Sequence, residues 1–245
     1  MNIIICVLIN YLGYVVSPAR IDETVLGAEQ ITEVFEVVNF SNDSLRIKIE
    51  FEDFDINEGG EVTFLDAGSI ANSVAPLATI NPEEFSVGPQ QTENIRVTFD
   101  FPKQPKSSEY YGMLLFKSQP IPTKYQPMIA IAGEIGVPIY FDDAELAIKN
   151  GQFEKLDVLK DTVFCIIKNT GNIHLRASGE AVLLRFDETI IEKDSIPEFV
   201  VFPGKSRNIK VPLAKKIPYG DTCIVRVRFD YGAVELIEAE RRFSR

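Results

Sequence analysis

The sequence predicts an all-β protein that consists of two tandem immunoglobulin-like β-sandwich domains. Three observations support this prediction. Apolar and polar residues alternate over many short stretches, turn-forming pairs separate the stretches, and one pattern occurs twice. No stretch of ten or more residues shows the periodicity of a helix. Many short strands at this spacing are typical of β-sandwiches.

The alternation is clearest at Leu45–Glu52, Ile95–Phe101 and Cys223–Phe229. In each stretch every second residue is apolar, and most of the residues between are charged or polar. This pattern predicts strands with one buried and one solvated face. Turn pairs such as Asn42-Asp43 and Asn150-Gly151 stand between such stretches.

An internal repeat predicts two copies of one domain. The pattern N-x-x-N-x-x-L-R occurs at Asn39–Arg46 and again at Asn169–Arg176. A second shared pattern runs from Phe85 to Val97 and from Phe199 to Val211. Repeated landmarks in the same order indicate a duplicated unit. We therefore expect domains at residues 17–142 and 143–245.

The first sixteen residues, Met1–Val16, contain no charged side chain and include a long apolar run. Their length suits the apolar region of a secretory signal better than a membrane span. We expect residues 1–16 to be a signal peptide, with a buried first strand as the alternative. The mature protein is then periplasmic or extracellular, and it meets a membrane only through this segment.

Composition excludes several classes of function. The 245 residues carry 25 basic and 36 acidic side chains, a net charge of −11, which disfavours nucleic acid and anionic lipid as partners. The single histidine, His174, cannot form a multi-histidine metal site. No phosphate-binding or nucleophile motif is present. We expect a protein that is no enzyme, with no cofactor, metal or small-molecule substrate.

Several segments of the first domain resemble the PapD-like pilus-assembly chaperones of the periplasm. They are Ser17–Ile21, Ile80–Val87, and Pro102 followed by Glu109–Gly112. The resemblance covers about residues 15–141, and the second half is similar only to a generic immunoglobulin-like domain. It implies an assembly factor that binds pilin-like subunits, or another envelope or surface protein, by donating an edge strand.

The resemblance also implies the donor strand, which would be the last strand of the first domain. Its apolar side chains share one parity at Ile129, Ile131, Ile135 and Val137. A row of this kind is what an inserted strand presents to its partner. The alternative is that the same row lies in the core of its own sandwich.

Members of this family hold the terminal carboxylate of the subunit with an arginine and a lysine. Arg20 matches the arginine, whose guanidinium binds a carboxylate through two hydrogen bonds. The position of the lysine falls at about Pro138, so the sequence supplies only half of this anchor. The alternative role for Arg20 is an ion pair with Asp22 or Glu23.

Cys165 and Cys223 lie on the expected second and sixth strands of the second domain, among aliphatic neighbours of the same parity. This placement resembles the inter-sheet disulfide of immunoglobulin domains. Two buried thiols are the alternative. For the whole chain, the rival to a chaperone is a structural cell-surface or adhesin-type scaffold whose sandwiches space or anchor partners.

Overall fold

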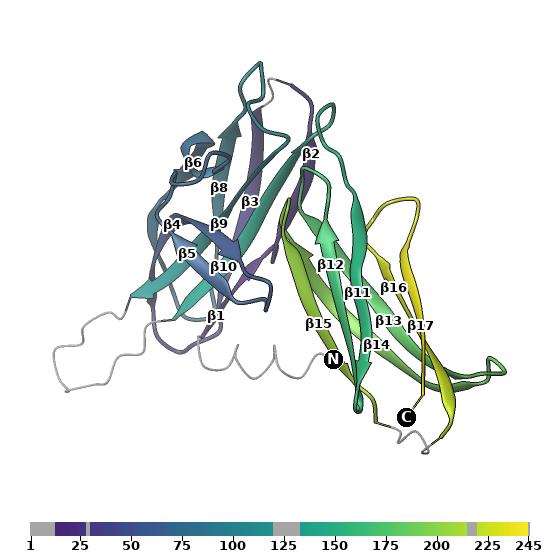
Figure 1. Ribbon diagram of the computed structural model, residues 1–245. Coiled ribbons are helices and arrows are strands. Elements are labelled where there is room, and N and C mark those ends of the chain that lie inside the picture. Colours follow the sequence, from purple (N-terminus) through teal and green to yellow (C-terminus); the bar gives the residue numbers. More distant parts are fainter. Residues whose placement is uncertain (1–12, 28–29, 120–132, 215–219, 245) are drawn as a thin grey trace. The chain divides into compact units, whose positions relative to one another are not determined.

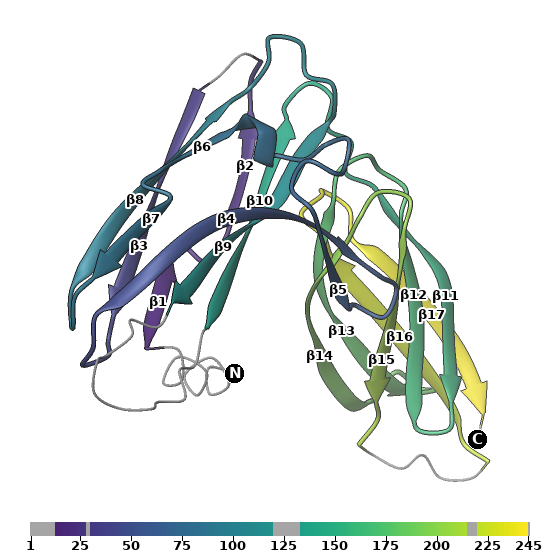
Figure 2. The ribbon, with the colours of Figure 1, turned by 90° about the vertical axis from the view of Figure 1, so that its left-hand side faces the viewer.

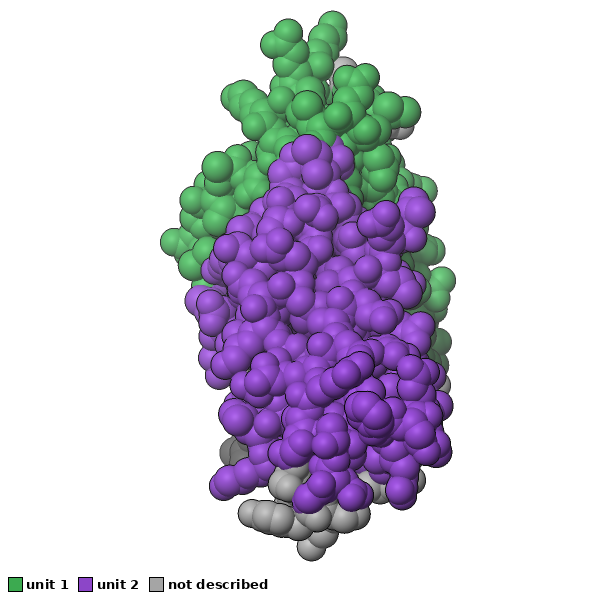
Figure 3. Space-filling view, turned by 45° about the vertical axis from the view of Figure 1, so that its right-hand side comes forward, with its two compact units in different colours: residues 1–54, 64–146 green, residues 55–63, 147–245 purple. Residues whose placement is uncertain are grey.

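The computed structural model describes residues 13–27, 30–119, 133–214 and 220–244 (Figure 1). The chain separates into two compact units, coloured in Figure 3. Unit 1 comprises residues 1–54 and 64–146, and unit 2 comprises residues 55–63 and 147–245. The division at 146/147 falls just after the expected boundary at 142/143, because the last strand of unit 1 continues to Asp143.

Unit 1 is a sandwich of two sheets (Figures 1 and 2). The first sheet has the order β1-β3-β8-β6, and the second has the order β2-β10-β9-β4-β5, with β7 also paired to β4. The strands are β1 Tyr14–Ser17, β2 Ile21–Val25, β3 Gln30–Asn39, β4 Leu45–Ile56, β5 Val62–Leu65, β6 Ala78–Asn81, β7 Glu84–Val87, β8 Thr92–Asp100, β9 Glu109–Gln119 and β10 Glu134–Asp143. A short 3-10 turn, η1, spans Ala75–Leu77.

The core of unit 1 is rich in phenylalanine. Phe35 packs against Phe116, with ring centroids 5.8 Å apart, and Phe99 packs against Phe141 at 4.8 Å. All four side chains are fully buried. Each pair joins one sheet to the other, because β3 and β8 belong to the first sheet and β9 and β10 to the second.

Unit 2 is a second two-sheet sandwich, with the strand orders β11-β12-β15 and β14-β13-β16-β17. Its strands are β11 Gly151–Leu159, β12 Thr162–Asn169, β13 Leu175–Arg185, β14 Ile190–Val201, β15 Ser206–Pro212, β16 Thr222–Asp230 and β17 Ile237–Ser244. The residues of alternating parity in β16, including Val225, Val227 and Phe229, are fully buried in its core. The predicted all-β class with two immunoglobulin-like sandwiches is therefore confirmed.

The start of unit 1 differs from the expected signal boundary. Tyr14, Val15 and Val16 lie in β1 and pair in register with β3, and Tyr14 is fully buried. The folded domain therefore begins before residue 17. The sequence did not reveal this, because an uncharged apolar stretch suits a sandwich strand as well as a leader. Residues 1–12 lie outside the described part of the chain. No helix of the described residues has the length and apolarity to cross a membrane.

Candidate functional site: the uncovered edge of β10

The first half of β10 lies at a sheet edge. On one side β10 pairs with β9 from Glu134 to Asp142. On the other side β2 pairs with β10 in parallel, but only from Ile139 to Asp143. Among the described residues, 134–138 therefore have a strand neighbour on one side only, and we call this stretch the uncovered edge.

The register shows which backbone groups the uncovered edge presents. The Ser118 N–H donates to the Gly133 carbonyl at 2.8 Å, so the backbone groups of Gly133 face β9. Backbone groups of antiparallel strands alternate in direction. Those of Glu134, Gly136 and Pro138 consequently face away from β9. The carbonyl of Pro138 faces β2, which begins to pair there, so among the described residues only the backbone groups of Glu134 and Gly136 have no strand partner on this side. Pro138 has no N–H to offer, so the donor groups of this edge end at Gly136.

Three groups hold the beginning of β10 in place. The carbonyl of Gly133 accepts hydrogen bonds from the Ser118 N–H at 2.8 Å, the Ser118 hydroxyl at 3.0 Å and the Tyr14 hydroxyl at 3.2 Å. The Gly133 N–H donates to Ser118 Oγ at 2.8 Å, and the Tyr14 hydroxyl also reaches the Phe116 carbonyl at 2.5 Å. The edge strand is therefore fixed at the residue directly before its uncovered stretch.

The side chains of Tyr14 and Ser118 were not predicted to belong to this site. Tyr14 lies in the uncharged N-terminal run, whose composition also fits a leader, and Ser118 is a lone serine near the end of a mostly apolar stretch. Burial raises the pKa of Tyr14 well above its ordinary value, so the phenol stays protonated and donates.

Arg20 lies beside the end of the uncovered edge. It directly precedes Ile21, which is in register with Ile139. Since the two strands are parallel, Arg20 on one strand lies opposite Pro138 on the other. The Arg20 Nε lies 3.9 Å from a carboxylate oxygen of Asp22, and 41% of the Arg20 side chain is exposed. A pair this long and this exposed contributes little to stability.

The predicted apolar row divides into three parts. Val137 is fully buried in the core of unit 1, so its side chain is unavailable to a partner and this part of the prediction is wrong. The parity of β10 turns Val137 inward together with Ile139 and Phe141. Ile135 is partly buried and packs against the same core. Ile129 and Ile131 lie outside the described residues.

A network of charged side chains lies beside the start of the uncovered edge. Lys117 faces Glu134 in register, with Nζ–carboxylate distances of 3.7 Å to Glu134, 2.9 Å to Glu52 and 3.2 Å to Glu50. The hydrogen bond from Lys48, followed by that from Lys117, holds the pKa of Glu50 below its usual value. The hydrogen bond to Glu52 raises the pKa of Lys117. Both shifts favour the charged forms of Glu50 and Lys117.

The two cysteines of unit 2 are free thiols in the structure, and both are buried in one core. Cys165 pairs across β11 and β15, whereas Cys223 pairs across β13 and β17. They thus lie in opposite sheets, as the immunoglobulin pattern implies, but they form no disulfide here. Burial raises the pKa of Cys165 to about 12, which makes this thiol a weak nucleophile.

Comparison with known proteins gave matches among solved structures. No family model and no curated protein matches the sequence. The class 5 fimbriae chaperone CfaA is 13% identical over 95% of this chain and 99% of its own, with a TM-score of 0.51. A chain of the CsuC–CsuE chaperone–tip adhesion subunit pre-assembly complex, from the archaic chaperone-usher Csu pili of Acinetobacter baumannii, is 11% identical over 92% and 97%, with a TM-score of 0.53. The YadV chaperone is 14% identical over 94% and 100%, with a TM-score of 0.51.

The chain has the PapD-like pilus-chaperone fold. Both sandwiches take part in this likeness, since the matches cover at least 92% of the chain. The sequence resemblance was limited to about residues 15–141, so the PapD-like fold extends further than the motifs indicated. At 11–14% identity the likeness is one of fold, and the function has to be argued from the site.

Proposed function

We propose that this protein is a non-enzymatic assembly chaperone outside the cytoplasm, which donates the uncovered edge of β10 to an incomplete, pilin-like subunit. Three PapD-like structures that it resembles are named as chaperones or as a chaperone–subunit complex. A protein of this kind needs an exposed strand edge and no catalytic group.

The observation that carries the proposal is the uncovered edge itself. Unpaired N–H and C=O groups at a strand edge readily pair with another chain. Natural proteins usually protect such an edge by a neighbouring strand, a charge or a proline. In β10 that protection by β2 and by Pro138 begins only after Gly136. Among the described residues, Glu134 and Gly136 have no strand partner on that side, and the charge of Glu134 is shared with Lys117. This stretch could therefore add a strand of a partner.

In this proposal the backbone and the side chains of the donor act at different places. Glu134 and Gly136 would contribute main-chain hydrogen bonds, whereas the side chain of Val137 fills the core of its own unit. Ile129 and Ile131 would supply the side chains that enter pockets of the subunit. Arg20, next to Pro138, would bind the terminal carboxylate of the subunit without help from a second basic residue on β10.

The test combines a backbone change with a side-chain change. Glu134→Pro removes an outward N–H from the uncovered edge, and Pro138 shows that this parity of β10 accepts proline. Glu134→Ala is the matched control, because it removes the same charge and keeps the N–H. Ile131→Asp places a charge in the proposed donor row.

Each variant would be expressed with an affinity tag in the source cells, and the captured envelope proteins would be identified by mass spectrometry. We expect the unmodified protein and Glu134→Ala to capture the same incomplete immunoglobulin-like subunit. Glu134→Pro and Ile131→Asp should lose it, while circular dichroism shows unchanged cooperative melting. Undiminished capture by both of these variants would instead favour the scaffold function.

A further inference from the structure

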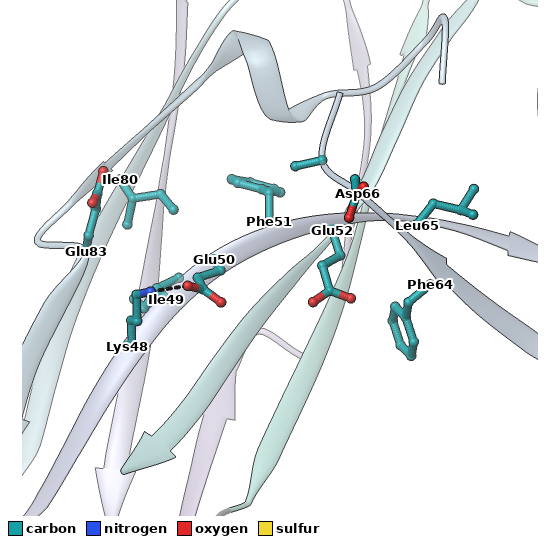
Figure 4. A pocket seen from close by; sticks show the side chains of 11 residues that line it. Lys48, Ile49, Glu50, Phe51, Glu52, Phe64, Leu65, Asp66, Ile80 and Glu83 are labelled. Carbon is teal, nitrogen blue, oxygen red and sulfur yellow. Dashed lines mark ion pairs between the residues drawn. The ribbon is translucent and has the colours of Figure 1, made fainter. Parts of the chain in front are cut away.

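A second surface of unit 1 lies on β4, on the side away from β9. β7 pairs with β4 only from Leu45 to Lys48, and β5 joins the same side of β4 farther along the strand. Between the two partners there is a hollow of about 590 Å³. Figure 4 shows Ile80 and Glu83 at one end of this hollow and Phe64, Leu65 and Asp66 at the other.

The backbone of β4 is accessible for pairing at the hollow. The Ile49 N–H donates to the Glu83 carbonyl at 2.7 Å, so the backbone groups of Ile49 face the side of β7. By the alternation of strand groups, those of Phe51 face the same side. Phe51 lies beyond the last residue of β4 in register with β7. A short extended segment could therefore hydrogen-bond to β4 at this point.

The walls of the hollow combine apolar and acidic side chains. Phe64 and Leu65 are 47% and 38% exposed, which is high for large apolar residues on an edge strand. Four carboxylates line the hollow, and Lys48 is the single basic residue of the lining. They are Glu50, Glu52, Asp66 and Glu83.

Only half of this negative charge is balanced. Glu50 and Glu52 are in ion pairs with Lys48 and Lys117. Within the described part of the chain, Asp66 and Glu83 make no ion pair, and both are exposed. An uncompensated carboxylate therefore lies at each end of the hollow, Glu83 at one end and Asp66 at the other.

A buried carboxylate fixes the wall that carries Asp66. Asp53 is fully buried and accepts hydrogen bonds from the Ser69 N–H at 2.7 Å, the Ile70 N–H at 3.0 Å and the Ser73 hydroxyl at 2.6 Å. The loop after β5 is therefore held to β4. The backbone of the segment that carries Asp66 is therefore preorganised, which lowers the entropic cost of binding.

We propose that this hollow binds an extended segment of a partner protein that presents a lysine or arginine between apolar residues. The stem of such a side chain packs on Phe64 or on Leu65, whose side chains project from opposite faces of β5, while its charged end reaches the carboxylates. The backbone of the segment pairs with β4 at Phe51. This site is separate from the uncovered edge of β10, because β9 lies between β10 and β4 in the sheet.

The test uses two synthetic peptides, acetyl-Val-Lys-Val-Lys-Val-amide and the same sequence with Glu in place of Lys. Each is titrated into the isotope-labelled full chain at low ionic strength, and amide chemical shifts are followed by NMR. We expect the lysine peptide alone to bind, and to shift the amides of Phe51 and residues 64–67. Equal binding of the two peptides, no binding, or shifts confined to residues 134–138 would overturn the proposal.

Variants with matched controls test the two parts of the site. Asp66→Lys with Glu83→Lys should weaken binding of the lysine peptide at least tenfold. The control, Glu36→Lys with Glu93→Lys, makes the same change of net charge on exposed positions of β3 and β8 and should change it less than twofold. Phe64→Ser should weaken binding at least threefold, and Phe40→Ser, another exposed phenylalanine of unit 1, should not. If test and control variants bind alike, the hollow is not the site.

Discussion

Asn39 and Asn169 occupy the same position in the two units, and each side chain forms hydrogen bonds with the backbone of the turn that follows it. The Asn39 amide donates to the carbonyls of Asp43 at 2.8 Å and Val87 at 3.1 Å, and its oxygen accepts from the Ser41 N–H at 2.8 Å. The side chain is fully buried. It thereby joins the turn between β3 and β4 to the end of β7.

Asn169 repeats these contacts in unit 2. Its amide donates to the carbonyls of Ile173 and Val201, both at 2.8 Å, and its oxygen accepts from the Gly171 N–H at 2.9 Å. The repeated N-x-x-N pattern thus marks a hydrogen-bonded turn in each sandwich. In both copies the first asparagine makes these bonds.

The first prediction concerns the stability of these turns. Asn39→Ala removes the donor to the carbonyls of Asp43 and Val87, of which the second bond is buried, and we expect it to lower the free energy of unfolding of unit 1 by about 1–3 kcal/mol. Asn169→Ala should do the same to unit 2. The control is Asn42→Ala, an exposed residue of the same turn, which should cost less than about 0.5 kcal/mol. Urea unfolding followed by circular dichroism measures all three. Equal losses for Asn39→Ala and Asn42→Ala would contradict this role.

The second prediction concerns the anchor of β10. Tyr14→Phe removes the hydroxyl that bonds to the carbonyls of Phe116 and Gly133. We expect a loss of roughly 1 kcal/mol and faster hydrogen exchange of the Gly133 and Ile135 amides. The matched control is Tyr110→Phe, since the Tyr110 hydroxyl accepts instead from the Lys106 N–H. If both variants change exchange at Gly133 equally, the anchor has no specific effect on β10.

The third prediction concerns the thiols of unit 2. Alkylation of the unfolded, unreduced protein should label Cys165 and Cys223, which peptide mass spectrometry would show. A disulfide-linked peptide pair would contradict the free thiols. Native Cys165 should resist alkylation at pH 8, because its pKa of about 12 leaves almost no thiolate.

The raised pKa of Cys165 also predicts that the free energy of unfolding falls as the pH rises above the ordinary thiol pKa. The unfolded thiol loses its proton near its ordinary pKa of about 8.5, whereas the folded thiol keeps it up to about 12. The contribution of this group is therefore present below the unfolded pKa and is lost as pH rises toward 12. In Cys165→Ala the decline of stability over this alkaline range should be shallower than in the unmodified protein, as urea titrations at several pH values would show.

The fourth prediction concerns Asp53. Asp53→Asn keeps the size of the side chain but turns an NH₂ group toward donors that now bond to a carboxylate. We expect a loss of about 2 kcal/mol or more and faster hydrogen exchange in residues 66–74. Asp55→Asn, two residues along β4 and partly exposed, is the comparison and should leave this loop protected. Unchanged exchange of the loop in Asp53→Asn would show that other contacts hold it.

Particular residues show how far the sequence could predict this molecule. Alternation predicted strands such as β4 and β16, because one buried and one wet face leave a period of two in the sequence. The alternation could not decide whether the side chain of Val137 packs in its own core or enters a partner, because a core strand and a donor strand both have an apolar side chain at every second residue. The pairing of β2 with β10 from Ile139 onward depends on contacts far apart in the chain, so the extent of the uncovered edge was not readable from local patterns.

The last prediction separates a binding role of Arg20 from a structural one. Arg20→Gln removes an exposed pair to Asp22 at 3.9 Å, and we expect the midpoint of thermal unfolding to change by no more than about 2 °C. If Arg20 binds the terminal carboxylate of a subunit, the same variant should lower capture of that subunit at least tenfold. Arg20→Lys should retain part of the capture, because it keeps the charge but loses the bidentate geometry. Asp22→Asn, which removes the charge that pairs with Arg20 at 3.9 Å, should leave capture unchanged or stronger. Full capture by Arg20→Gln would show that Arg20 does not bind the subunit.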